Sequence, residues 1–130
     1  MSDIPSSLRT YLRTVTAVST AFGNRIAVLK VPDGTTYPFA VIRTVSDPAF
    51  YTQDGEALRE TIVQIDVFDD DALGAQTNAG LIRAALTGHS GTMGDYTVGA
   101  VFVREQQDQW MSDARHFKVF NQYVINWTVT

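Results

Sequence analysis

The segment that most constrains the fold of this chain is residues 59–88, RETIVQIDVFDDDALGAQTNAGLIRAALTG. Apolar and polar residues alternate over Leu58–Phe68, which predicts a strand with one apolar face. After three aspartates, apolar residues recur at helical spacing over Ala72–Thr87, and Gly88 ends the pattern. The segment therefore predicts a strand followed by a helix, and nothing in it suggests a catalytic centre. The expected packing side of that helix consists of Leu73, Ala75, Ala79, Ile82, Ala85 and Leu86.

The rest of the chain predicts one more helix and four more strands. Apolar residues at helical spacing predict a helix over Ile4–Phe22, stopped by Gly23-Asn24. Two polar segments, Ser46–Ala57 and Glu105–Arg115, are expected to be loops. The fold class is α+β, a mostly antiparallel sheet of four to five strands with two helices packed on one face, in a single domain over residues 1–130. The other expected strands are Arg25–Val31, Pro38–Val45, Tyr96–Arg104 and His116–Val129.

Composition narrows the possible partners. The net charge is −4, and the ten Lys and Arg residues are scattered along the chain, which disfavours tight binding of nucleic acid. The chain has no cysteine, so disulfides and thiolate metal sites are excluded. It has no apolar run of membrane-spanning length and no signal-peptide pattern at the N-terminus, so no membrane partner is expected.

The aspartates Asp69, Asp70 and Asp71 form the densest carboxylate cluster. A calcium site would need more ligands at defined spacing, whereas aspartates before a helix stabilise its exposed N–H groups and its dipole. We therefore expect helix capping, with no metal and no cofactor. The glycines of residues 88–94 follow a helix and precede a strand, which is the reverse of the order in a phosphate-binding loop.

Neither His89 nor His116 lies in a recognisable catalytic motif, so an enzyme is not expected. Two rival interpretations stay open on the residues alone. One is a hydrolase with an unusual site around the two histidines and nearby carboxylates. The other is a small non-catalytic module that binds a ligand or partner, with Trp110, Met111 and Tyr123 lining a pocket.

Four segments in order carry a resemblance to a known family: Gly23-Asn24-Arg25-Ile26, then the strands at 37–42 and 63–68, then Ile82–Gly88. With the final alternating strand, they make the chain resemble the tail completion or tail terminator proteins of long-tailed bacteriophages, prophages and gene transfer agents. The resemblance covers nearly the whole chain, and it includes no active-site signature.

The resemblance implies a structural virion protein that caps the tail tube, terminates its polymerisation and forms part of the head-tail joining interface. The implied partners are the tail tube protein, the head-tail connector protein and other copies of the chain in a hexameric ring. DNA would pass through the ring without specific binding, in a virion tail made in the host bacterial cytoplasm. We expect the two polar loops to make the contacts, through Phe50, Tyr51, Gln53, Asp54, Gln107, Trp110 and Met111.

Overall fold

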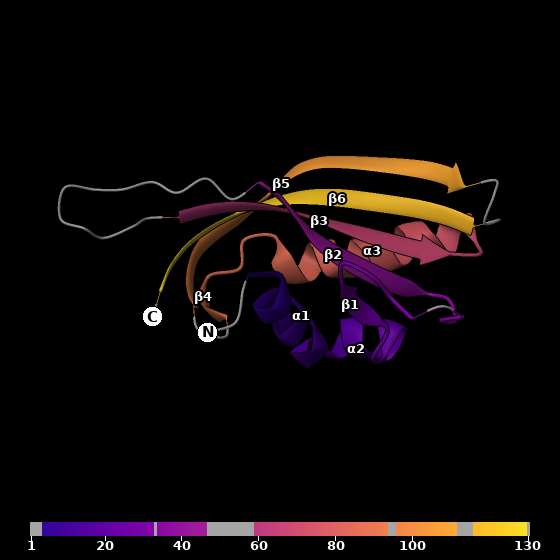
Figure 1. The fold of residues 1–130 in the computed structure, drawn as a ribbon, viewed down its shortest axis with the longest axis horizontal. Coiled ribbons are helices and arrows are strands. Elements are labelled where there is room, and N and C mark those ends of the chain that lie inside the picture. The colour runs from indigo at the N-terminus through magenta and orange to yellow at the C-terminus, as the bar shows by residue number, and fades with distance from the viewer. Residues whose placement is uncertain (1–3, 33, 47–58, 94–95, 112–115, 130) are drawn as a thin grey trace.

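A six-stranded sheet organises the chain in the computed structural model, which describes residues 4–32, 34–46, 59–93, 96–111 and 116–129 (Figure 1). β1 and β2 run parallel, and every other neighbouring pair is antiparallel. The α+β class is confirmed, but the sheet has more strands than the four to five predicted and includes one parallel pair. In spatial order the strands are β1 (Ile26–Val28), β2 (Phe39–Ser46), β3 (Arg59–Asp69), β6 (His116–Val129), β5 (Tyr96–Met111) and β4 (Gly91–Met93).

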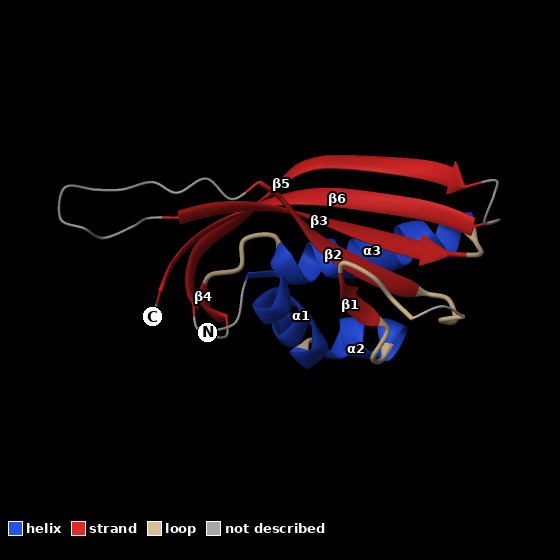
Figure 2. Cartoon of the chain, in the orientation of Figure 1, coloured by secondary structure: helices blue, strands red, loops and turns tan. Residues whose placement is uncertain are grey.

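Three helices, α1 (Ile4–Thr14), α2 (Thr16–Phe22) and α3 (Ala72–Leu86), lie on one face of the sheet (Figure 2). The single helix predicted over Ile4–Phe22 is wrong, because Val15 is extended, with φ −81° and ψ 115°, and separates α1 from α2. Val15 stands between two threonines, and three consecutive β-branched residues weaken a helix. Gly23, with φ 57°, ends α2 as expected.

The core fills the space between the helices and the facing side of the sheet. From β3, Val63, Ile65 and Val67 point into it, as the alternation predicted, and α3 covers them with Ile82 and Leu86. None of the helices in the described part of the chain is long and apolar enough to cross a membrane.

Leu73 is the exception on the expected packing side of α3, since 70% of its surface is exposed. The buried residues Ala75, Ala79, Ile82 and Leu86 follow the helical period. Leu73 precedes the buried Ala75 by two residues, which turns its side chain by about 200° around the helix axis, so it points away from the sheet.

The polar segment after Arg104 was wrongly predicted as a loop. β5 continues through it to Met111 and pairs with β6, from Glu105 opposite Gln122 to Met111 opposite His116. The register shifts between Val98 and Ala100 and between Val103 and Glu105, and each bulge interrupts the alternation from which a strand is recognised. β4 was likewise missed, because its three residues, Gly91–Met93, lie in a glycine-containing segment.

Candidate assembly surfaces

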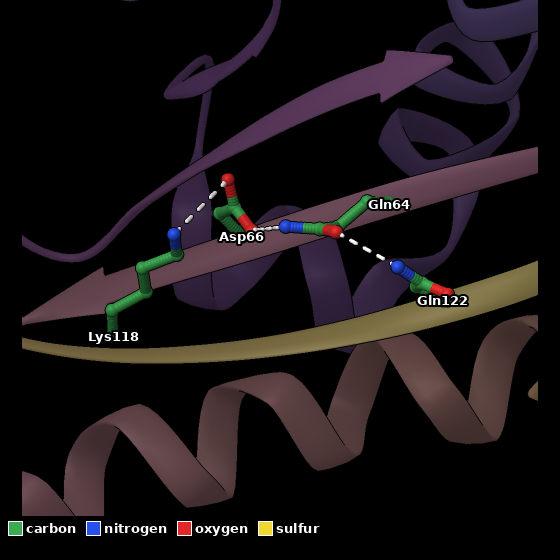
Figure 3. A network of polar contacts seen from close by, with 4 residues as sticks. All are labelled: Gln64, Asp66, Lys118 and Gln122. Carbon is green, nitrogen blue, oxygen red and sulfur yellow. Dashed lines mark hydrogen bonds and ion pairs between the residues drawn. The ribbon is translucent and has the colours of Figure 1, made fainter. Parts of the chain in front are cut away.

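A ladder of polar side chains runs across the helix-free face of the sheet, from β6 to β3 and back (Figure 3). Gln122 Nε2 donates to Gln64 Oε1 at 3.1 Å, and Gln64 Nε2 donates to Asp66 Oδ1 at 2.7 Å. The other oxygen of Asp66 lies 3.9 Å from Lys118 Nζ. Gln64 and Asp66 are buried although none of the described helices covers this face. The ladder joins buried polar atoms to one another and fixes these side chains in one arrangement.

An aromatic cluster lies at one end of this face. The ring centroids of Phe39 and Phe68 are 4.9 Å apart, and those of Phe68 and His116 are also 4.9 Å apart. The Tyr37 hydroxyl is 2.9 Å from His116 Nδ1. Burial lowers the pKa of His116, and the charge of Lys118 lowers it further. The imidazole is therefore part of a neutral aromatic cluster at neutral pH.

The other end of the helix-free face is apolar. Phe102 of β5 stands opposite Val124 of β6, which in turn stands opposite Ile62 of β3. Phe102 leaves 57% of its surface exposed. A large aromatic side chain at a sheet edge, without cover, is a feature of contact surfaces.

On the helix side, a hollow of about 230 Å³ opens beside the first turn of α3. Trp110 and Phe117 form its aromatic wall, with ring centroids 4.6 Å apart. Gln76 of α3 donates to Asp108 of β5 at 3.0 Å and closes another side. Trp110, which lines the hollow, is half exposed. This end of the β5–β6 hairpin therefore carries apolar surface with no cover in the described chain.

The aspartates between β3 and α3 are engaged in the turn. Asp71 is the N-cap, and its Oδ2 accepts from Gly74 N at 2.8 Å, so the predicted capping is confirmed for this residue. Asp69 accepts from Asp71 N at 3.2 Å and from Asn78 Nδ2 at 3.1 Å. Burial is the main cause that raises the pKa of Asp69. Within the described residues, no group of three or more histidines and carboxylates is placed to hold a metal ion.

The two histidines lie on opposite faces of the sheet. His89 follows α3 and lies against Tyr11 of α1, with ring centroids 4.3 Å apart. His116 belongs to the aromatic cluster of the helix-free face. A shared catalytic site would require both in one place, so this geometry contradicts a hydrolase built on the pair.

The predicted contact residues do not form one surface in the described part of the structure. Gln107 and Trp110 are both exposed, but on different faces of β5. Gln107 pairs with Phe120 on the helix-free face, whereas Trp110 pairs with Phe117, which lines the hollow on the helix side. Met111 is the last residue of the strand. Tyr123 is fully buried in the core, so it does not line a pocket with Trp110. Phe50, Tyr51, Gln53 and Asp54 lie outside the described residues.

Sequence reasoning missed two exposed apolar side chains at the sheet edges, Val45 and Phe102. Both belong to segments that were predicted as strands, but a strand pattern alone does not show which parts of a strand have a neighbour. The short outer strands β1 and β4 pair only with Ala40–Ile42 of β2 and Tyr96–Val98 of β5, so Val45 and Phe102 lie beyond them.

These surfaces define a class of protein: an α+β building block whose distinctive features are exposed apolar residues and sheet edges. A comparison with family models is more specific. Residues 6–126 match the model described as tail completion protein gp17, which spans most of the chain, and the chain therefore belongs to this family of structural tail proteins of bacteriophages.

A solved structure has the same fold. One chain of the virion of a native gene transfer agent (GTA) particle superposes with a TM-score of 0.75 at 13% sequence identity, over 96% of this chain and 94% of that chain. At this identity the likeness establishes the fold alone. No curated protein matches the chain in sequence.

Proposed function

We propose that the protein caps the finished tail tube, stops its polymerisation and forms part of the surface to which the head connector attaches. The observation that carries this proposal is the apolar end of the β5–β6 hairpin, where the half-exposed Trp110 and Phe117 line a hollow that the described residues leave open. Interfaces are enriched in such aromatic anchors, and truncation of one commonly costs most of the binding. Membership in the tail completion family supports the tail as the place of assembly.

The partners follow from this role. The tail tube protein would contact the hairpin end through Gln107, Trp110 and Met111, and through the segment Ser46–Ala57 with Phe50, Tyr51, Gln53 and Asp54. Copies of the chain would form a hexameric ring on the tube in the virion tail. DNA would pass through the ring without specific binding, because a chain with net charge −4 repels the phosphate backbone.

The test combines purified tail tube protein with the wild-type chain and images the tube ends by negative stain. Wild-type protein is expected to give capped tubes of limited length. Trp110→Ala should lower the affinity for tube ends by about tenfold or more while the protein stays folded. Leu29→Ala is the matched control, because Leu29 is a large apolar side chain exposed elsewhere, beyond β1.

A deletion tests the other predicted contact segment. Removal of residues 49–54 is expected to leave a folded monomer that no longer caps tubes. Intact ring assembly and capping in this variant would remove that segment from the proposed contacts. Uncontrolled tube growth in the presence of folded wild-type protein would contradict the capping function itself.

A second candidate function, a small module that binds a ligand or partner, is favoured by the hollow itself. Its aromatic wall and the Asp108 carboxylate suit a small amphipathic or cationic group. Ligand-dependent melting of a monomer that ignores tube ends would support this alternative.

A further inference from the structure

Each side of the sheet has an edge stretch that no strand of the described chain covers. β4 pairs with β5 only at Tyr96–Val98, and Gly88 N then donates to Val101 O at 3.3 Å. Over Phe102–Gln106, β6 is the only strand within the described residues that pairs with β5. On the other side, β1 pairs with β2 at Ala40–Ile42, and over Arg43–Ser46 β3 is the only strand of the described chain that pairs with β2.

The two uncovered stretches lie at the same height along the strands. The register runs from Ser46 of β2 to Ile62 of β3, then to Val124 of β6 and Phe102 of β5. At the next level it runs from Arg43 to Gln64, Gln122 and Glu105. The backbone of Arg43–Ser46 on one side therefore matches that of Phe102–Glu105 on the other.

Each stretch also carries an exposed apolar side chain. Val45 is 40% exposed and Phe102 is 57% exposed. Edge strands of proteins that stay single are commonly protected by charges, bulges or proline. Each stretch has a bulge and an arginine, Arg43 or Arg104, so the exposed apolar side chain is the feature of each edge that lacks such a role. Val45 lies at the bulge beside Ser46, one residue from the height of Phe102, so the two apolar side chains come close in a head-to-tail contact between identical copies.

Strand directions allow the same contact. β2 is antiparallel to β3, β3 to β6 and β6 to β5, so β2 and β5 run in opposite directions. A second copy rotated about an axis parallel to the strands keeps these directions. Its β2 would then lie antiparallel to β5 of the first copy, and the alternation of the sheet would continue across the contact. β1 does not pair with Arg43–Ser46, since its register with β2 ends at Val28 opposite Ile42 and Leu29 N donates to Ile42 O.

We propose that adjacent copies join by pairing Phe102–Gln106 of β5 in one copy with Arg43–Ser46 of β2 in the next, with Phe102 opposite Ser46 and diagonal to Val45. The contact uses different surfaces on the two copies, so it repeats from copy to copy and closes into a ring when the rotation permits. This inference rests on the proposed ring and specifies how its sheet edges meet.

The absence of cysteine from the chain makes a cross-linking test specific. The full-length double variant Val45→Cys/Phe102→Cys is treated with a short bismaleimide, alone and with tail tubes. It is expected to give a ladder of covalent oligomers up to the ring. Each single variant should stay monomeric, as should the control Val45→Cys/Leu73→Cys, which moves one thiol to an exposed site on α3.

The outcomes separate this inference from the capping function. Rings that give no series of cross-linked oligomers would overturn the edge pairing and leave the capping function intact. Cross-linked dimers of the Phe102→Cys single variant would show that β5 pairs with β5 of another copy, which would overturn the inference. A cross-link between Val45→Cys and the tube protein would show that the tube occupies the β2 edge, which would overturn it as well. A chain that forms no ring and ignores tube ends would overturn the capping function as well.

Discussion

Helix α3 contains two glycines in different surroundings, and replacing each by alanine should change stability in opposite directions. Gly80 is exposed in the middle of the helix, and an added Cβ would meet nothing within 4 Å. At Gly74, in the first turn, the added Cβ would lie 2.7 Å from Asp69 Oδ2 and 3.2 Å from its Cγ. The same substitution in one helix therefore separates helix propensity from steric cost.

The magnitudes follow from these distances. Gly80→Ala should stabilise the fold by about 0.5–1 kcal/mol, the propensity difference in a helix interior. Gly74→Ala forces the buried Asp69 carboxylate to move, although it is held by Asp71 N at 3.2 Å and Asn78 Nδ2 at 3.1 Å. A lost hydrogen bond to a charged group costs about 1.5–3 kcal/mol, which exceeds the propensity gain. We expect a net loss of about 1–2 kcal/mol.

Urea unfolding followed by tryptophan fluorescence measures both variants, and the midpoint should rise for Gly80→Ala and fall for Gly74→Ala. A double-mutant cycle identifies the cause. In an Asp69→Ala background, the closest contacts that oppose Gly74→Ala are gone and only Asp71 Oδ2, at 3.3 Å, remains, so the substitution should cost clearly less than in the wild type. Equal midpoints for the two glycine variants in the wild-type background would refute the steric argument.

Three further substitutions test other parts of the fold. Leu29 has φ 70° and an exposed side chain, so Leu29→Gly should raise the free energy of unfolding by up to about 1 kcal/mol in urea titrations. Asp66→Ala should lower it by about 1–3 kcal/mol because buried Gln64 Nε2 loses its acceptor, whereas Asp66→Asn should cost less. Burial lowers the pKa of His116 in the folded state, so the unfolded state binds more protons as the pH falls through the ordinary pKa of histidine. The stability should therefore fall with pH in this range, and His116→Gln should flatten the dependence in thermal melts across pH.

Much of the fold follows from local periodicity. The strand β3, the helix α3 and the final strand β6 have clear patterns, and the structure places them where the sequence predicts. The capping role of Asp71 was also predictable, because its chemistry depends only on neighbours three residues away. These features share one property: the interactions that decide them are close in sequence.

The missed features depend on tertiary partners. The polar half of β5 forms a strand because β6 pairs with it, and its bulges hide the alternation from a pattern search. The exposure of Phe102 depends on the short outer strand β4, which pairs with β5 only at Tyr96–Val98, and no sequence pattern reveals that pairing. The predicted contacts were assigned to loops, whereas the described apolar candidates lie mainly on strand edges and at the start of α3.

Some surface groups make their contacts within the chain and others do not, and this difference bears on how a tail cap could stop the growth of the tail tube. On the helix-free face, the ladder joins Gln122, Gln64, Asp66 and Lys118, so these groups make their contacts within one chain. Exposed apolar side chains lie instead at the sheet edges and at the hairpin end. In the proposed ring, these apolar side chains would contact neighbouring copies and one tube end, while the ladder groups would already be paired within each chain. Such an arrangement would favour termination over the addition of a further layer of rings.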